Sequence, residues 1–314
     1  MDHDATTSSA SAWRLLAFAA ALALLALLPR PARADIGACT VIDTLPYTIF
    51  TPGRYCLDHD IVGTSVQGYR LRIYADNVVF DCSDFRLVDS NDANTNSAIM
   101  VDGDHKNVTI RNCVIDNFQT GIQIQESADN GSSGHVIENN TILRSRQVGM
   151  SLAGSNMRIE GNRVLGNTGN LNGIAYGIRV FSSYANGVGN TIRNNLVADF
   201  KPTPPPATGT QVIGISFFYV HDTEVTGNTV SGLYSTTNQY TYAIDSSSAT
   251  GSVVTDNHLL APPALPAPLD GNSFYGIHLA GTPQEQATNL CRGNTVGHWS
   301  TDIVGCTQVD NTAF

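Results

Sequence analysis

The chain has 314 residues, of which 42% are hydrophobic and 14% are charged, and 28 of them are glycines. This composition is typical of a globular, glycine-rich β protein and argues against a disordered chain or a helical bundle. The formal net charge of -10 argues against nucleic acid and anionic membranes as partners, because both bind positively charged surfaces.

The first 34 residues are predicted to be an export signal. Leu15 to Leu28 form an unbroken apolar run, and the small residues Ala32 and Ala34 follow it at a spacing that suits a cleavage site. The run is short against the roughly 20 residues that a membrane-spanning helix needs. We therefore expect a mature protein that starts at Asp35, is secreted or periplasmic, and has no membrane partner.

The cysteines predict disulfides at both ends of the mature chain. All six lie after residue 34, where disulfides can persist if the protein is exported. We expect Cys39 to pair with Cys56 and Cys291 to pair with Cys306. Each member of the remaining pair, Cys82 and Cys113, falls inside a repeat, which leaves a disulfide and buried thiols as alternatives. No CxxC pair occurs, which argues against a zinc ribbon.

Residues 35–72 are expected to form an N-terminal cap, and residues 73–314 repeat a short template that predicts their fold. The template is an apolar residue, any residue, a small or polar residue, Asn, any residue, and then Val, Ile or Leu. Clear copies are "IENNTI" (137–142), "IEGNRV" (159–164), "IRNNLV" (192–197), "VTGNTV" (225–230), "VTDNHL" (254–259) and "CRGNTV" (291–296). The fourth position reads Ser83, Cys113, Asn140, Asn162, Asn195, Asn228, Asn257 and Asn294. Because the intervals vary from 22 to 37 residues, a coil with loops of different size is favoured over a helical repeat.

A second motif, a small residue followed by Ile or Met, comes after each anchor. It reads "AIM" at 98, "GIQ" at 121, "GMS" at 149, "GIR" at 177, "GIS" at 214, "AID" at 243, "GIH" at 276 and loosely "DIV" at 302. Units with such short strands cannot bury their apolar faces alone, so they must stack in parallel register, about 4.8 Å apart. The repeated Asn should take a left-handed bend and bond the identical amides above and below. We predict an all-β fold, a right-handed parallel β-helix of about eight coils.

The run "TPGRYCLDHDIVGTSVQGYRLRIYADNVVFDCSDFRLV" (51–88), followed by repeats of the "IEGNRV" and "YGIRV" kind, resembles a known family. It is similar to the right-handed parallel β-helix repeat proteins of the pectin-lyase-like superfamily, including exported NosD-like members. The resemblance implies the fold and a range of roles: polysaccharide lyases, uronate epimerases, hydrolases, esterases and non-catalytic surface proteins. The sequence lacks the Asp-Pro-His motif of alginate epimerases and the aspartate signature of polygalacturonases, so no family catalytic residue is transferred.

Residues that follow the Ile or Met of the second motif should face outward and form one column along the axis. The column reads Met100, Gln123, Ser151, Arg179, Ser216, Asp245, His278 and Val304. Arg179 has no carboxylate beside it in this column, whereas Asp245 and His278 are neighbours. In the outward column of the first motif, by contrast, opposite charges alternate, as in Asp81 with Arg111, which is typical of a solvated sheet.

The predicted substrate-binding residues surround this column. Tyr176, Tyr242 and Tyr275 precede the small residue of three repeats, and aromatic rings pack on the apolar faces of sugars. Three further residues, Ser216, Phe218 and His221, complete the predicted substrate-binding set. Ser216 lies in the column, and His221 is a weaker candidate on a bend. Of the adjacent Phe217 and Phe218, one should be in the core and the other exposed. Long connections that begin at 201, 231 and 261 should wall a groove beside the column.

These residues suggest chemistry on an acidic polysaccharide. Arg179 would neutralise a uronate carboxylate and His278, oriented by Asp245, would remove the adjacent ring proton, which gives a lyase or an epimerase. Hydrolysis fits less well because it usually needs two carboxylates. The alternative is a non-catalytic glycan-binding or cell-surface scaffold, in which Asp245 and His278 are a cross-strand pair and the tyrosines a packing stack. We expect no metal site and no cofactor, with a calcium requirement left open, and a monomer.

Overall fold

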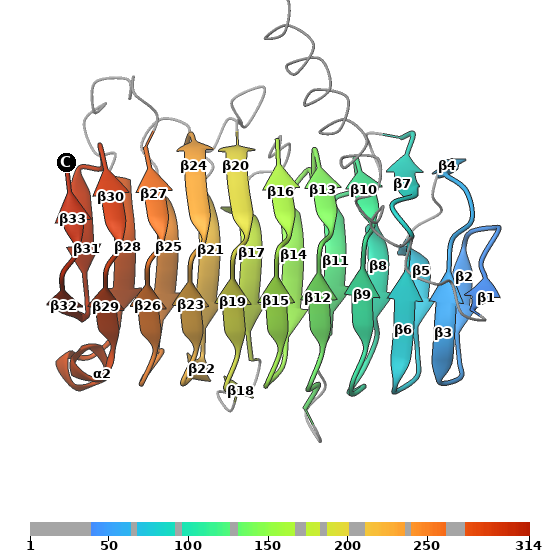
Figure 1. Ribbon diagram of the computed structural model, residues 1–314, viewed down its shortest axis with the longest axis horizontal. Coiled ribbons are helices and arrows are strands. Elements are labelled where there is room, and N and C mark those ends of the chain that lie inside the picture. The colour runs from blue at the N-terminus through green and yellow to red at the C-terminus, as the bar shows by residue number, and fades with distance from the viewer. Residues whose placement is uncertain are drawn as a thin grey trace, which may run out of the picture. The chain divides into compact units, whose positions relative to one another are not determined.

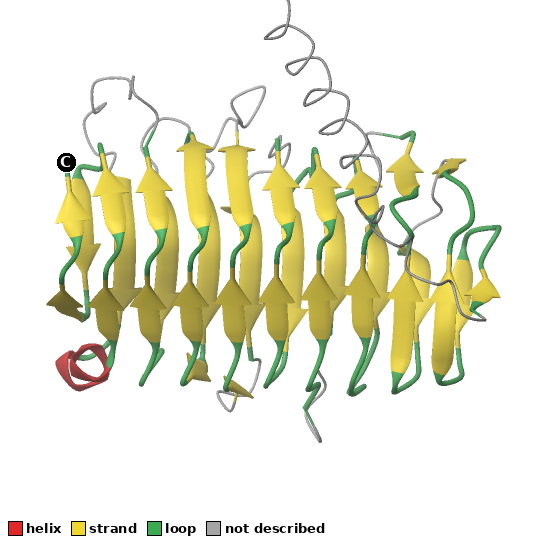
Figure 2. Cartoon of the chain, viewed as in Figure 1, coloured by secondary structure: helices red, strands yellow, loops and turns green. Residues whose placement is uncertain are grey.

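The computed structural model describes residues 39–314, apart from 64–67, 92–95, 126–130, 167–173, 183–186, 201–210, 236–239 and 262–273. The predicted export signal therefore lies outside the described residues. The described chain is a stack of coils that contributes one strand per turn to each of three long parallel sheets (Figures 1 and 2). Within this part of the chain, no helix has the length and apolar character needed to cross a membrane.

Sheet A carries the strands of the first motif. Its eleven described strands are β1 (Thr40–Val41), β3 (Gly53–Cys56), β6 (Val78–Asp81), β9 (Thr109–Arg111), β12 (Val136–Glu138), β15 (Arg158–Glu160), β19 (Thr191–Arg193), β23 (Glu224–Thr226), β26 (Val253–Thr255), β29 (Leu290–Arg292) and β32 (Thr307–Val309).

Sheet C follows sheet A in each turn, after the anchor residue. Its ten described strands are β4 (Ile61–Gly63), β7 (Arg86–Asp89), β10 (Val114–Asp116), β13 (Thr141–Leu143), β16 (Arg163–Leu165), β20 (Leu196–Phe200), β24 (Thr229–Leu233), β27 (His258–Leu260), β30 (Thr295–Gly297) and β33 (Thr312–Ala313).

Sheet B carries the second motif and completes the turn. Its ten described strands are β2 (Tyr47–Ile49), β5 (Tyr69–Ile73), β8 (Ser97–Val101), β11 (Thr120–Ile124), β14 (Val148–Ala153), β17 (Ile174–Phe181), β21 (Gln211–Phe218), β25 (Thr241–Ser247), β28 (Phe274–Ala280) and β31 (Thr301–Val304). A short pair, β18 (Gly187–Val188) and β22 (Val220–His221), and the helix α2 (Pro283–Thr288) lie in connections.

The predicted fold class is confirmed, and the stack is longer than the eight coils that the two motifs mark. Strands from β1 to β5, in the segment expected to be a cap, already pair into sheets A, B and C. After the last recognised anchor, Asn294, the strands β32 and β33 add a further turn, with Asn311 at its anchor position. These turns escaped the sequence search because they lack one or both motifs.

The anchor asparagines form a buried ladder between sheets A and C. The side-chain Nδ2 of Asn195 donates to Asn228 Oδ1 and to Ile159 O, both at 3.0 Å, and the backbone N of Asn195 donates to the same Asn228 oxygen at 3.0 Å. The same pattern runs from Asn140 to Asn311. Each inserted polar side chain is thus fully bonded, as burial requires.

One detail of the bend was predicted wrongly. The left-handed conformation belongs to the residue before each anchor Asn, such as Asn139 (φ 55°), Gly161 (φ 66°) or Asn194 (φ 55°), and not to the Asn itself. The preceding residue turns the chain, which leaves the anchor side chain pointing inward, where its amide reaches the next coil.

The small residue of the second motif lies where sheets B and C approach each other. A Cβ placed on Gly177 would come within 2.4 Å of Gly214 O and 2.5 Å of Val197 Cγ1. At Gly177 there is no room even for a Cβ, and in the coils of Ala98 and Ala243 a single methyl group is accommodated at the same position.

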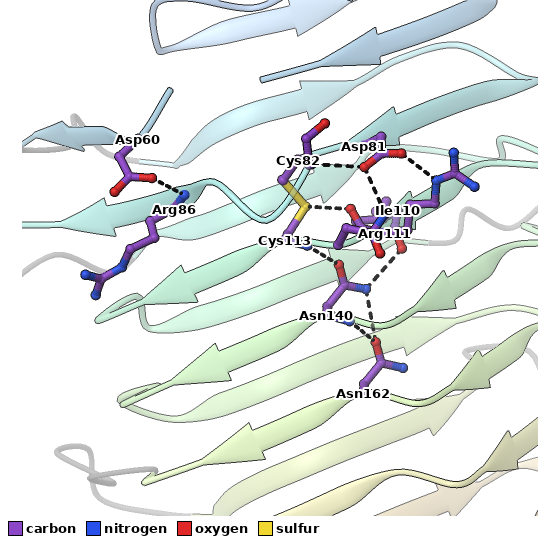
Figure 3. The surroundings of a disulfide bond; sticks show 11 residues. Asp60, Asp81, Cys82, Arg86, Ile110, Arg111, Cys113, Asn140 and Asn162 are labelled. Atoms are coloured by element: carbon purple, nitrogen blue, oxygen red, sulfur yellow. Dashed lines mark hydrogen bonds and ion pairs between the residues drawn. A yellow bond between two sulfur atoms is a disulfide. The ribbon is translucent and has the colours of Figure 1, made fainter. Parts of the chain in front are cut away.

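The two predicted terminal disulfides, Cys39–Cys56 and Cys291–Cys306, are present, and Cys82 and Cys113 form a third. The buried-thiol alternative for that pair is therefore wrong. Cys82 follows the last residue of β6 and lies one position before the anchor, and Cys113 is the anchor of the next coil, with Cα atoms 4.7 Å apart. Figure 3 shows this disulfide beside the ladder, where Cys113 N donates to Asn140 Oδ1.

Candidate functional site

The outward column of sheet B has the predicted register. Parallel pairing places Arg179 beside Ser151 and Ser216, and Asp245 beside Ser216 and His278. The core side of the same strands is apolar, with Ile178, Ile215 and Ile277 fully buried. The column also extends two strands further back than predicted, to Arg72, which pairs with Met100, and to Thr48, which pairs with Arg72.

Arg179 is held by aromatic rings. Its guanidinium carbon lies 5.1 Å from the ring centre of Tyr176, 4.5 Å from that of Phe181 and 4.7 Å from that of Phe218. Among the described residues no carboxylate pairs with it, and its buried Nε has no hydrogen-bond partner. Burial lowers the pKa of Arg179 from its ordinary value, although the group stays cationic at neutral pH because that value is so high. A partly desolvated cation that pairs with no carboxylate in the described part of the chain is suited to a ligand anion.

Asp245 and His278 form a hydrogen-bonded pair. His278 Nδ1 lies 2.9 Å from Asp245 Oδ1, and both side chains are partly exposed. The imidazole also contacts the rings of Tyr242 and Tyr275, with ring centres 5.1 and 5.0 Å away. The carboxylate therefore fixes the orientation of the imidazole, an arrangement suited both to a general base and to a structural cross-strand pair.

The tyrosines do not form one continuous stack. Tyr242 and Tyr275 stack at 5.1 Å and 14°, but Ile213 lies between Tyr176 and Tyr242 in the ladder of strands. Burial, followed by the negative charge of Asp245, raises the pKa of Tyr242 far above its usual range. This tyrosine is therefore a stable neutral ring and a poor proton donor in catalysis.

The site consists of two adjoining parts. The first is Arg179 with Tyr176, Phe181 and Phe218; the second is the Asp245–His278 pair with the Tyr242–Tyr275 stack. Ser216 lies between them in the column but is buried, with 2% of its surface exposed, so it offers little to a ligand. Between Arg179 and His278 there are three strand spacings, about 14 Å along the axis.

The remaining predicted binding residues divide between this face and another. Phe217 is fully buried whereas Phe218 stacks on Phe181 at 5.3 Å beside Arg179, as the sequence suggested for the adjacent phenylalanines. His221 belongs to β22, at the corner between sheets B and A, and its Nδ1 lies 2.6 Å from Thr250 Oγ1. It is therefore outside the column.

Sequence reasoning missed two aromatic residues of the site. Phe181 lies two positions after Arg179, and Tyr240 lies two positions before Tyr242, with ring centres 6.0 Å apart. The period of two along a strand could have found both. Of the connections expected to wall the groove, residues 201–210, 236–239 and 262–273 lie outside the described part of the chain.

The outward face of sheet A behaves as predicted for a solvated surface. Arg111 Nε donates to Asp81 Oδ2 at 2.8 Å, and Arg193 pairs with Glu160 at 2.9 Å. Arg111 and Arg193 of sheet A are thus neutralised by neighbours in their own column, whereas Arg179 on sheet B pairs with no carboxylate of the described residues. In the described residues no group of three or more His, Cys, Asp or Glu side chains is arranged to hold a metal ion.

The fold and its face of aromatic and charged columns define a parallel β-helix protein. The family model described as the right-handed β-helix region matches residues 65–296. The chain belongs to this family.

Two solved structures are also similar, both of mutants of the tailspike protein of E. coli bacteriophage HK620 in complex with a pentasaccharide. One has 15% identity and a TM-score of 0.43 over 85% of this chain and 53% of the tailspike chain. The other has 14% identity and a TM-score of 0.39 over 82% and 54%, so the chain spans about half the length of either. A comparison with curated proteins found no match.

Proposed function

We propose that this protein is exported and binds an acidic polysaccharide along the outer face of sheet B. The observation that carries the proposal is Arg179, a desolvated cation framed by Tyr176, Phe181 and Phe218 and lacking a carboxylate partner among the described residues. A uronate offers what this arrangement lacks: a carboxylate for the guanidinium and apolar C–H faces for the rings. Three disulfides support export, because disulfides persist in oxidising compartments.

A second candidate function, elimination or epimerisation at a uronate, is favoured by the Asp245–His278 pair. His278 would remove the proton next to the sugar carboxylate, and Asp245 would stabilise the imidazolium that forms. This chemistry needs the cation that neutralises the carboxylate close to the base. Arg179 lies three strand spacings from His278 and packs against aromatic rings of its own strand and of the next one. We therefore favour polysaccharide binding over catalysis as the function.

The experiment that tests both functions uses the mature protein with alginates, pectates and glycosaminoglycans, each with and without calcium. Binding is followed by affinity electrophoresis in gels containing the polymer, and turnover by ultraviolet absorbance of unsaturated uronides and proton NMR of the products. The matched variants are Arg179→Gln on sheet B and Arg193→Gln on sheet A.

Recognition predicts retardation in at least one acidic gel, lost in Arg179→Gln and kept in Arg193→Gln. Equal retardation of the two variants would refute the role of Arg179, because it would mean that the net charge alone governs migration. Catalysis further predicts that His278→Gln binds normally and loses turnover. Binding without new absorbance or altered uronate signals would leave the glycan-binding scaffold as the function.

A further inference from the structure

The aromatic frame of Arg179 occurs twice in the chain. The segment "YRLRIY" (69–74) has the same pattern as "YGIRVF" (176–181): a tyrosine, an arginine three positions later, and an aromatic residue two positions after that. Both segments are strands of sheet B, β5 and β17, and their arginines lie in the same outward column. The two copies are four strand spacings apart, about 19 Å along the axis.

The geometry of the two copies matches closely. The guanidinium carbon of Arg72 lies 5.5 Å from the ring centre of Tyr69 and 5.0 Å from that of Tyr74. In the other copy, Arg179 lies 5.1 Å from Tyr176 and 4.5 Å from Phe181. In each copy, too, the arginine Nε is buried without a hydrogen-bond partner in the described structure.

The copies differ in the residue that the next coil places beside the frame. Beside Phe181 the next strand presents Phe218, which adds a third ring to Arg179. Beside Tyr74 the next coil presents Asp102, which forms an ion pair with Arg72. The Arg72 copy is therefore electrically neutral, and the Arg179 copy keeps a positive charge that no carboxylate of the described residues compensates.

The neutral copy also has the more open aromatic surface. Phe50 and Tyr74 are 68% and 48% exposed, and their rings lie 6.3 Å apart. The edge of this surface carries polar groups, since His105 contacts Tyr74 at 5.1 Å and hydrogen-bonds to Asp76 at 3.0 Å. Exposed ring faces with carboxylates at the rim fit a sugar ring, which has apolar C–H faces and hydroxyls on its edge.

We propose that Phe50, Tyr74 and the Arg72–Asp102 pair form a second sugar-binding subsite, which takes a neutral sugar, whereas the Arg179 frame takes an acidic one. The polymer would then contain both kinds of unit and lie lengthwise over sheet B. Because Asp102 already satisfies Arg72, a sugar carboxylate would gain no free cation there and would meet Asp102 and Asp76 as like charges. This inference rests on the proposed function only in placing a glycan on the same face.

The test is affinity electrophoresis of the mature protein in gels containing neutral polymers (galactomannan, xyloglucan and dextran) and, separately, the acidic polymers named above. The variants are Phe50→Ala with Tyr74→Ala, and Arg179→Gln. We expect the double variant to weaken neutral binding about thirtyfold, since each of the two lost ring contacts contributes on the order of 1 kcal/mol, and to keep acidic binding. Arg179→Gln should do the reverse.

A gain of function provides a second test that does not depend on removing aromatic rings. Asp102→Phe gives the Arg72 copy a third ring, like the one that Phe218 supplies to Arg179, and removes the carboxylate that pairs with Arg72. Acidic binding should therefore reappear when Asp102→Phe is added to Arg179→Gln. No retardation in any neutral gel, or the same retardation with and without Phe50 and Tyr74, would overturn the neutral subsite. If Arg179→Gln left acidic binding unchanged while the double variant still lost neutral binding, the proposed function would be overturned and the neutral subsite would stand.

Discussion

Replacing one asparagine of the buried ladder should cost much of the stability of the whole stack. Asn195 accepts from the backbone N of Asn162 at 2.9 Å and from its Nδ2 at 3.0 Å, and donates to Ile159 O. In Asn195→Ala the Asn162 N–H and the Ile159 carbonyl lose these bonds in a buried site. At about 1 to 3 kcal/mol for each unsatisfied group, the free energy of unfolding should fall by about 4 kcal/mol.

The assay is urea unfolding followed by circular dichroism, with all disulfides intact. Asn195→Asp is the sharper variant, because its second oxygen would face Ile159 O and Asn228 Oδ1, so an acceptor meets acceptors. At neutral pH it should destabilise at least as much as Asn195→Ala. The control, Arg193→Ala, removes a surface ion pair and should cost less than about 1 kcal/mol. A loss below about 1 kcal/mol for Asn195→Ala, or a milder effect of Asp than of Ala, would refute the reasoning.

Three further predictions concern the core. Burial lowers the pKa of His135 from 6.5 to about 4, so the unfolded chain binds a proton at a higher pH than the folded protein does. The free energy of unfolding should therefore be full above about pH 6.5 and fall by about 3 kcal/mol as the pH drops to about 4. Urea unfolding at a series of pH values should show this fall in the wild-type protein and not in His135→Asn. Joint replacement of Cys82 and Cys113 by serine should lower stability by about 3 kcal/mol, measured by the same unfolding; an unchanged midpoint would contradict this. In Gly177→Ala the new methyl group would clash with Gly214 O, so the melting temperature should fall. An unchanged melting temperature would show that the neighbouring strands can move apart at this position.

The fold could be predicted from the sequence because its two constraints are local and repeated. The anchor Asn and the small residue each face an identical residue in the next coil, as Asn195 faces Asn228 and Gly177 faces Gly214, so the requirement recurs wherever a coil does. Turns that meet the requirement with other residues were harder to find. The early coils have Ser83 and a disulfide-bonded Cys113 at the anchor, and β5 has Arg70 between Tyr69 and Leu71, where the next strand has the small residue Ala98 between Ser97 and Ile99.

The site could be predicted only in part. The column that contains Arg179, Asp245 and His278 follows from the two-residue period of a strand and was placed in the correct register. The burial of Ser216 could not be seen, because it depends on the large side chains that surround it. The division of the tyrosines by Ile213, in contrast, follows from the sequence, because Ile213 precedes the small residue of the repeat between those of Tyr176 and Tyr242.

The asparagine ladder also has a direction. Each side-chain amide donates toward the C-terminal coil and accepts from the N-terminal one, as Asn162 does between Asn140 and Asn195. A coil turned over would set oxygen against oxygen, so coils can be joined in one orientation only. Every junction between two anchor asparagines, on the other hand, is chemically the same, whether 22 or 37 residues separate them. The length of chain between two anchors can thus vary without altering the hydrogen bonds that join the coils.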